Sequence, residues 1–378
     1  CVPWLKRSLL RLRDHGNTIL IVEHHREIIK IADEIVDMGP AAGSGGGTIM
    51  YQGNYDGLVE SDTITGRMLR SRSQWKDGVR TPKSFFTLEH AKLHNLKDVT
   101  AHIPFGVMTV IAGVAGSGKS SLMEAFLRAY TEPVISIRQK DIGINLRSTP
   151  ATYLDLSDEI RKLFAKANKV SNTLFSFNSK GACPACGGKG VIVSDMSFMD
   201  AIETECELCH GTRYAQEVLE YKYKGKNIAE VMDMTVTEAI GFFAGEEFLI
   251  RLQSLEDVGL GYLHLNQAMT TLSGGELQRV KLASELHKKG AVYILDEPTN
   301  GLHLDDVRKL LILFNRMVDE GNTLIVIEHS LDVLRQADYV LELGPEGGMS
   351  GGRLLYEGTP RGMLTCGVSV TKEYLKDA

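Results

Sequence analysis

The feature that most constrains the fold of this 378-residue chain is an apolar strand that leads directly into a glycine-rich loop and a helix. Residues 108–112 are apolar or β-branched, residues 113–120 read GVAGSGKS, and residues 121–130 favour a helix. Glycines let backbone amides approach a phosphate closely, and a GxxxxGKS run has this role between a strand and a helix. We therefore predict an α/β fold in which this loop binds a nucleotide phosphate.

The residue types in this loop indicate separate chemical roles. Lys119 would place a cation on the β- and γ-phosphate oxygens, and the hydroxyl of Ser120 would ligate Mg²⁺. A glycine-rich turn without function is the alternative, which the flanking strand and helix disfavour. The predicted nucleotide contacts from this loop are Gly113, Gly116, Ser117, Gly118, Lys119, Ser120 and Ser121.

A second phosphate-sensing pattern lies downstream, where residues 272–276 read LSGGE and open a helix. A serine hydroxyl and glycine amides can reach an anion here, and the positive N-terminal end of the helix points the same way. Alone, these small polar residues resemble many helix caps, but together with the phosphate loop they become a strong signal. The predicted nucleotide contacts are Ser273, Gly274, Gly275 and Glu276.

Two apolar strands end in ionisable side chains. The first, residues 291–295, is followed by Asp296, which suits a contact to Mg²⁺, and Glu297, which is placed to polarise an attacking water. His329 ends the next strand, where an imidazole would meet the γ-phosphate; a histidine that caps a helix is the alternative. Gln139 follows an earlier strand and is either a contact to Mg²⁺ and the water or a surface glutamine.

Four of the six cysteines form two CxxC pairs. Cys183 and Cys186 are separated from Cys206 and Cys209 by 19 residues, and glycines follow each pair closely. Two such turns supply four thiolates for a closed Zn²⁺ site, which would be structural because no position is left for water. The pattern predicts metal binding in a reducing compartment such as the cytoplasm, with disulfides as the alternative. His210 could replace a cysteine but is not needed.

An internal repeat indicates that the chain holds parts of two similar domains. Residues 14–53 align without a gap with residues 319–358, and 15 of the 40 aligned positions are identical. The second copy follows the phosphate loop, the LSGGE helix and the acidic strand, whereas the first copy lacks all three. Residues 1–60 are therefore predicted to be the tail of a first, truncated nucleotide-binding domain, with 18–23 as a buried parallel strand. A duplicated unit without a nucleotide role is the alternative.

Composition sets the remaining expectations. Hydrophobic and charged contents of 43% and 24% are typical of a globular protein, and the sequence has no apolar run of about 18 residues, so no membrane association is predicted. The net charge of −6 argues against a uniformly basic nucleic-acid coat. The predicted order is 1–60, tail of the first domain; 61–82, linker; 83–130, phosphate-loop part of the second domain; 131–268, insertion with a zinc module at about 181–213; 269–378, the rest of the second domain.

The motifs GxxxxGKS, LSGGELQR, ILDEPTNGLH and IVIEHS in this order resemble an ABC-type ATPase. The four-cysteine module between the first two motifs, and the run RSTPATY at residues 147–153, narrow the resemblance to the UvrA family of DNA-damage-recognition ATPases and its UvrA-like paralogs. The resemblance implies a P-loop ABC-type ATPase domain with an inserted helical signature domain that carries the zinc module. It also implies ATP, Mg²⁺ and Zn²⁺ as cofactors, and the residue roles given above.

The resemblance implies partners as well. These are damaged double-stranded DNA, bound through its backbone and deformability rather than its sequence, and UvrB for the full-length family. ABC-type sites are composite, so the missing N-terminal half or a second copy would complete them. Ile144 stands where the family commonly has an arginine, which weakens the case for basic contacts there. The alternatives are a UvrA-like antibiotic self-resistance ATPase, a transporter ATPase, and an inactive fragment folded around zinc.

Overall fold

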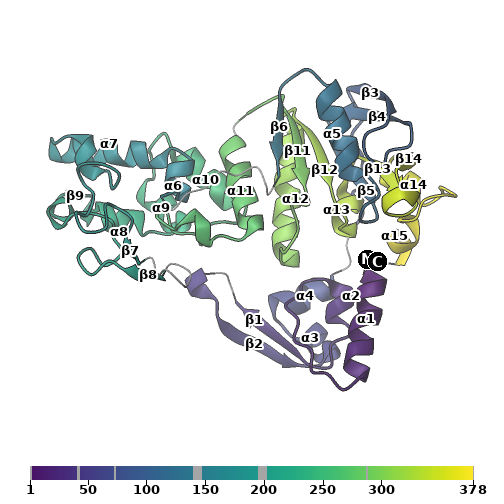
Figure 1. The fold of residues 1–378 in the computed structure, drawn as a ribbon, viewed down its shortest axis with the longest axis horizontal. Helices are drawn as coiled ribbons and strands as arrows, with labels where there is room; N and C mark the ends of the chain where they lie inside the picture. The colour runs from purple at the N-terminus through teal and green to yellow at the C-terminus, as the bar shows by residue number, and fades with distance from the viewer. Residues whose placement is uncertain are drawn as a thin grey trace. The chain divides into compact units, whose positions relative to one another are not determined.

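The computed structural model describes residues 2–40, 43–71, 74–138, 147–194, 202–286 and 288–377. The chain separates into two compact units, which Figure 1 traces from purple to yellow along the sequence. The first, here called the sheet unit, comprises residues 1–141 and 285–378, and the second, the insert unit, comprises residues 142–284. Across the described ranges, no helix is both long and apolar enough to cross a membrane.

The sheet unit contains a six-stranded sheet in which five neighbouring strands run parallel and the sixth, at one edge, is antiparallel. Its central strands are almost continuous apolar runs, as expected of parallel strands that are covered on both faces. The predicted α/β fold is therefore confirmed. In spatial order the strands are β14 (Arg353–Gly358), β13 (Tyr339–Gly344), β5 (Met108–Gly113), β12 (Thr323–Ile327), β11 (Val292–Asp296) and β6 (Val134–Ile137).

One apolar cluster joins this sheet to α5 (Lys119–Ala129) and to an antiparallel pair, β3 (Ser84–Ala91) and β4 (Val99–Phe105). Alternate sheet residues, such as Ile111 and Ile327, contribute to the cluster because side chains alternate along a strand. The sequence predicts a strand pair over residues 85–99, but the second strand begins only at the end of that range. The buried residues of α5 in the cluster are Leu122, Met123 and Phe126.

Further helices of the sheet unit follow its strands. The longest, α12 (Leu304–Asp319), contacts β12 and β5, and its buried residues recur at helical spacing, as an amphipathic helix requires. Three shorter helices follow α12 along the chain: α13 (Leu331–Gln336), α14 (Pro360–Met363) and α15 (Lys372–Asp377). The carboxyl ends of β5, β12 and β11 lie next to one another, because the three strands are parallel neighbours in the sheet.

The sequence repeat is also a structural repeat. The antiparallel hairpin of β1 (Ile35–Gly39) and β2 (Thr48–Gly53) matches that of β13 and β14, and the ladder is irregular after Asp37 in one copy and after Glu342 in the other, 305 residues apart. In both copies a cis Gly-Pro bond follows the first strand. The structure thus shows two copies of the same hairpin, only one of which belongs to the six-stranded sheet.

Residues 18–23 do not form the buried parallel strand that the sequence predicts. They lie outside the assigned strands, and Leu20 and Val22 are 95% and 92% exposed. The matching strand β12 is paired on both sides, by β11 and β5. Within the described residues nothing pairs with 18–23 in this way, and a strand without neighbours leaves its backbone groups unpaired. The same apolar pattern therefore forms a strand only where the rest of the sheet is present.

Four helices precede or follow the first-copy hairpin along the chain. Helix α4 falls inside the stretch 61–82 for which the sequence indicates a linker, and Thr63 caps it by accepting a hydrogen bond from the Gly66 amide. The first half of that stretch is therefore ordered secondary structure. The four helices are α1 (Val2–Asp14), α2 (Arg26–Ile29), α3 (Tyr55–Glu60) and α4 (Ile64–Arg70).

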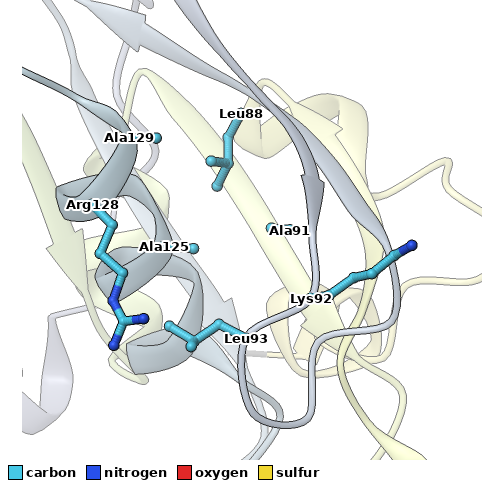
Figure 2. Close-up of a pocket in the computed structure, with 7 residues that line it drawn as sticks. All are labelled: Leu88, Ala91, Lys92, Leu93, Ala125, Arg128 and Ala129. Carbon is cyan, nitrogen blue, oxygen red and sulfur yellow. The ribbon is translucent and has the colours of Figure 1, made fainter.

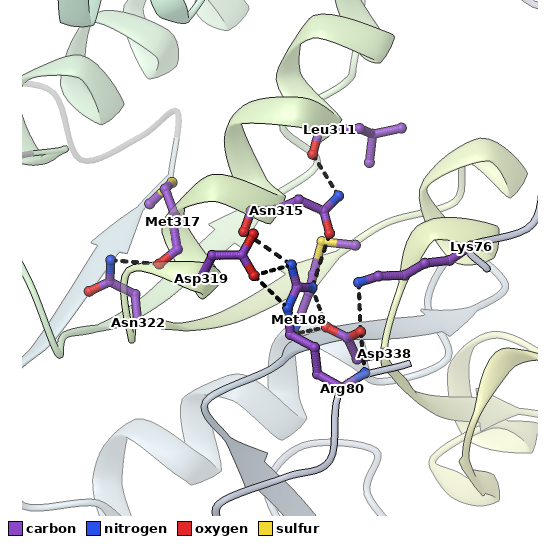
Figure 3. A network of polar contacts seen from close by, with 9 residues as sticks. All are labelled: Lys76, Arg80, Met108, Leu311, Asn315, Met317, Asp319, Asn322 and Asp338. Carbon is purple, nitrogen blue, oxygen red and sulfur yellow. Dashed lines mark hydrogen bonds and ion pairs between the residues drawn. The ribbon is translucent and has the colours of Figure 1, made fainter. Parts of the chain in front are cut away.

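A buried carboxylate fixes the segment 74–83, here called the leading segment, to the sheet unit (Figure 3). The Asp338 side chain is fully buried, and its Oδ1 accepts hydrogen bonds from Lys76 Nζ at 2.6 Å and from the Arg80 amide at 2.9 Å. Its Oδ2 accepts from Arg80 Nη1 and from the Met108 amide, both at 3.0 Å. Burial would raise the pKa of Asp338, but these donors lower it below the usual value, so the carboxylate is ionised at neutral pH.

The same arginine joins the leading segment to α12. Arg80 donates to Asn315 Oδ1 at 3.0 Å and forms an ion pair with Asp319 at 2.7 Å. Figure 3 shows its guanidinium between these groups and Asp338. The leading segment is therefore held at two places at once, at Asp338 just before β13 and at the end of α12.

The insert unit is mainly helical. An aromatic cluster forms part of its interior, with Phe164 packed against Phe175 and Tyr223, Tyr221 against Phe175, and Phe242 against Tyr223. Its elements are α6 (Pro150–Tyr153), α7 (Leu156–Asn168), η3 (Asn172–Phe175), β7 (Val191–Ser194), β8 (Ile202–Glu205), η4 (Gln216–Glu220), β9 (Lys222–Tyr223), β10 (Lys226–Asn227), α8 (Ile228–Met232), α9 (Val236–Phe242), α10 (Leu249–Asp257), η5 (Met269–Thr271) and α11 (Gly274–Glu285).

Candidate nucleotide site and metal centre

The glycine-rich loop joins β5 to α5 in a conformation that requires its glycines. Gly113 has a φ of 137°, and a Cβ at this position would lie 2.1 Å from the carbonyl oxygen of Leu343 on β13. Gly118, with a φ of 104°, precedes the first residue of α5. A side chain at either position would be strained, and at Gly113 it would also collide with a neighbouring strand. The predicted strand-loop-helix unit is confirmed.

Lys119 lies across the loop that it follows. Its Nζ donates to the carbonyl oxygens of Gly113 and Val114 at 2.9 and 3.0 Å, and the residue is only 6% exposed. Burial lowers the pKa of the Lys119 ammonium to about 8, although the carboxylates of Glu297 and Asp296 oppose this change. The Lys119 ammonium is therefore already attracted by the carboxylates of Asp296 and Glu297 at the end of β11.

This pKa predicts that ATP binding weakens with rising pH. Only the ammonium form of Lys119 attracts phosphate, and its protonated fraction falls above pH 8, so the dissociation constant of ATP should rise about tenfold between pH 7 and pH 9. Titration of a fluorescent ATP analogue across this range measures the effect. Lys119→Arg keeps its charge and should give a nearly flat profile. The same slope in both proteins would assign the pH dependence to another group.

A polar side chain that the sequence analysis missed braces the loop from outside. Asn95 Nδ2 donates to the carbonyl oxygens of Gly116 and Gly348 at 3.0 and 3.2 Å, and Ser121 Oγ lies 3.4 Å from its Oδ1. The carbonyl oxygens of Gly116 and Ser117 also accept hydrogen bonds from the amides of Gly348 and Gly352, in the glycine-rich segment after β13. An isolated asparagine carries no motif, so only the tertiary contacts reveal this role.

Glu297 and His329 meet at the carboxyl ends of β11 and β12. The Nε2 atom of His329 lies 3.1 Å from Oε1 of Glu297, and both side chains are partly open to solvent. The hydrogen bond from His329 lowers the pKa of Glu297 below its usual range, against the opposing effect of burial. Glu297 has a φ of 47°, a left-handed conformation that is uncommon for a glutamate and concentrates at functional sites. The pair has the geometry of an ionised base oriented by an imidazole.

The neighbouring carboxylates have different environments. Burial and the adjacent charge of Glu297 raise the pKa of Asp296 above its usual value. Glu328 is 3% exposed, and its carboxylate accepts hydrogen bonds from the amides of Thr299 and His329 at 3.0 and 2.7 Å. Glu328 therefore fixes both the turn after Glu297 and the backbone of His329. The sequence shows this glutamate only as the neighbour of a predicted site residue.

The LSGGE residues lie in the insert unit, at the start of α11. Ser273 and Glu276 form a reciprocal cap: the Ser273 amide and hydroxyl donate to Glu276 Oε2 at 2.7 and 2.8 Å, and the hydroxyl accepts from the Glu276 amide at 3.3 Å. Tyr262 donates to the other carboxylate oxygen. Burial would raise the pKa of Glu276, but these hydrogen bonds lower it. Ser273 and Gly274 are exposed, so this helix start is open to an anion.

Four buried cysteines converge in the insert unit. The sulfur atoms of Cys183 and Cys206 are 3.9 Å apart, those of Cys186 and Cys209 are 3.7 Å apart, and all four lie within 4.8 Å of one another. Zn–S bonds of about 2.3 Å in a tetrahedron place sulfurs about 3.8 Å apart, so the donor set fits a four-thiolate Zn²⁺ site. The thiols are free rather than disulfide-bonded. The side chain of His210 is 79% exposed and is not needed as a ligand.

The structure brings Lys119, at the start of α5, near Asp296 and Glu297 at the end of β11. His329, just after β12, contacts Glu297. Ser120 is exposed at the first turn of α5. Gln139 lies outside the described residues, so its assignment stays a prediction.

A groove in the sheet unit is separate from this constellation. It has a volume of about 330 Å³ and lies between α5 and the turn after β3 (Figure 2). Its lining contains none of the predicted nucleotide contacts. The lining residues are Leu88, Ala91, Lys92, Leu93, Ala125, Arg128 and Ala129.

Comparison with known proteins identifies the family of the chain. The family model described as "ABC transporter" matches residues 96–300. UvrABC system protein A of Thermus thermophilus is 46% identical over 400 residues, which cover 96% of this chain and 42% of that protein. The protein of the same name from Staphylococcus aureus is 43% identical over 410 residues, with 99% and 43% covered. The crystal structure of UvrA2 from Deinococcus radiodurans matches with a TM-score of 0.92 at 40% identity, over 98% of this chain and 49% of that one.

The fold and the loop, acidic-strand and histidine geometry define an ATPase of ABC type, and the family match extends over more than half of the chain. The chain therefore belongs to the ATP-binding cassette family. Within that family it is similar to UvrABC system protein A over almost its whole length, as the sequence motifs predict. The chain spans about two fifths of the length of these relatives.

Proposed function

We propose that this chain supplies one nucleotide-binding cassette, and the tail of another, to a DNA-damage-recognition ATPase of nucleotide excision repair. The observation that carries the proposal is the meeting of Lys119, at the start of α5, with Asp296, Glu297 and His329 at the ends of two adjacent strands. The identity to proteins named UvrABC system protein A supports the assignment to repair. For the full-length protein we propose UvrB and damaged double-stranded DNA as partners.

In the proposed reaction, the glycine-rich loop binds the phosphates of ATP and Lys119 moves from the loop carbonyls to the β- and γ-phosphate oxygens. Ionised Glu297 accepts a proton from the water that attacks the γ-phosphate, while His329 orients this carboxylate. Mg²⁺, when bound by Ser120 and Asp296, supplies positive charge for the phosphoryl oxygens. We propose that Ser273 to Glu276 complete a site in a partner cassette, from the missing half or a second copy.

We also propose that the four cysteines hold a structural Zn²⁺. The insert unit, which contains this centre, would help to engage the DNA backbone. We propose that the short tyrosine-lysine hairpin at 221–226 contacts DNA phosphates. Both tyrosines pack into the aromatic cluster, whereas Lys222 and Lys226 are exposed. Neutralising phosphates would make DNA binding fall with rising salt.

ATP hydrolysis over a series of protein concentrations, with and without ultraviolet-damaged duplex DNA, tests the proposed function. We expect the specific activity to rise with concentration, because each site needs a second cassette, and to respond to damaged DNA more than to intact DNA. Activity that is independent of concentration would contradict composite sites. Activity that is equal with damaged, intact and no DNA would contradict a repair function.

A further inference from the structure

The two CxxC turns follow the same backbone course. Residues 183–190 align with residues 206–213 at an offset of 23, and positive φ angles recur at matching positions. The matching pairs are Gly187 and His210 (58° and 46°), Gly188 and Gly211 (78° and 74°), and Gly190 and Arg213 (80° and 75°). The last pair places an arginine where the sister turn has a glycine.

An arginine is an unfavourable choice for this backbone. Its Cβ crowds the chain in the left-handed region, whereas glycine adopts it freely. The backbone of Arg213 has an essential place, since its carbonyl oxygen accepts a hydrogen bond from the Cys183 amide at 2.9 Å, but a glycine could form the same bond. The reason for an arginine at position 213 must therefore lie in its side chain.

The Arg213 side chain reaches across to the first CxxC turn. A Cβ added to Gly190 would lie 3.2 Å from Arg213 Cγ and 3.6 Å from its Nε, and the Gly190 amide itself donates to Cys186 Sγ at 3.3 Å. The guanidinium lies 5.3 Å from the ring centroid of Phe177, and the residue is only 9% exposed. Among the described residues, Nη1 of Arg213 is buried without a hydrogen-bond partner.

The charge of the proposed metal centre explains why the Arg213 guanidinium is buried beside the first CxxC turn. Four thiolates and one Zn²⁺ leave about two negative charges, and all four cysteines are at most 7% exposed. A buried anionic centre is costly unless a cation lies nearby. Lys189 is close in sequence to Cys186, but it is exposed, where water screens its charge.

We propose that Arg213 is the buried counter-charge of the four-cysteine centre and thereby strengthens its hold on the metal. This inference rests on the proposed zinc site. Arg213 is a positioning residue rather than a ligand, because guanidinium is always protonated and has no lone pair to offer. Burial lowers the pKa of Arg213, and thiolate charge at Cys186 and Cys209 opposes this shift, as expected for a guanidinium between the two turns.

Zinc affinity of the whole chain, measured by competition with a chromophoric chelator at fixed pH, tests the inference. Arg213→Gly removes the charge and relieves the backbone, and we expect zinc to bind about tenfold or more weakly, the usual effect of a group just outside the ligands. Arg213→Lys keeps the charge and should lose less affinity. Lys189→Ala removes an exposed charge near the same centre and should change affinity less than about twofold.

The outcomes separate the two proposals. A folded Arg213→Gly protein that binds zinc as tightly as the wild type would overturn the counter-charge and leave the zinc centre intact. A wild-type chain without cysteine-dependent zinc binding would overturn the centre itself. If Arg213→Gly fails to fold by circular dichroism, Arg213→Lys and Arg213→Gln decide the matter, because equal affinities in those two proteins would show that charge is irrelevant.

Discussion

Glu297→Gln is expected to lower the rate of ATP hydrolysis by about two to three orders of magnitude, while ATP still binds with nearly unchanged affinity. The amide has almost the shape of the carboxylate and can still bond to His329, but it cannot take a proton from water. Because the His329 hydrogen bond lowers the pKa of Glu297, the wild-type side chain is ready to act as a base at neutral pH. Steady-state phosphate release and equilibrium binding of an ATP analogue measure the two effects.

Glu124→Gln is the matched control for this experiment. Glu124 is a glutamate of α5 whose partners are the surface residues His94 and Arg128, so its loss should leave turnover unchanged. Retention of wild-type turnover in Glu297→Gln would remove this residue from the proposed mechanism. Equal losses of turnover and of ATP affinity would mean that Glu297 acts in binding rather than in the chemical step.

Loss of one cysteine of the metal centre is the second large effect expected. Cys186→Ser should abolish zinc binding and unfold the region around residues 181–213, because structural zinc contributes about 10–16 kcal/mol to folding in small modules. The sheet unit has its own apolar core and should keep its ATP affinity. Zinc content, limited proteolysis and binding of an ATP analogue distinguish the two units.

Cys366→Ser serves as the control, since this half-buried thiol lies in the sheet unit, outside the four-cysteine cluster. It should leave both the zinc content and the proteolytic pattern unchanged. One equivalent of zinc retained in Cys186→Ser, with no change in proteolysis, would contradict a four-thiolate structural centre.

Local motifs predicted the strand-loop-helix unit and the two CxxC turns because each of these units consists of residues close together in sequence. The strand before Gly113 positions the glycine-rich loop, and each CxxC spacing positions two thiols near each other. The meeting of the two turns, 23 residues apart, depends on the fold of the insert unit. Asn95, Glu328 and Arg213 have no such signature. Their roles depend on partners brought near by the tertiary structure, in one case more than 250 residues away along the chain.

The two copies of the repeat show the limit of pattern reading. Residues 18–23 and β12 share the same apolar, β-branched character, yet only β12 is a strand. An apolar run indicates that a segment can be buried in a sheet. Whether it forms a strand depends on the presence of neighbouring strands. The hairpin forms in both copies, as β1 and β2 in the first and as β13 and β14 in the second, because its two strands pair with each other.

The bonds of Lys76 and Arg80 to Asp338 determine how a pulling force on the leading segment would reach the sheet unit. A pull on residues before Lys76 would load several short polar bonds together, so they would have to shear at once rather than open in sequence. One of the bonds to the same carboxylate comes from Met108, the first residue of the strand that ends at the glycine-rich loop. The leading segment is therefore coupled through Asp338 to β5, the strand that leads into the glycine-rich loop before Lys119.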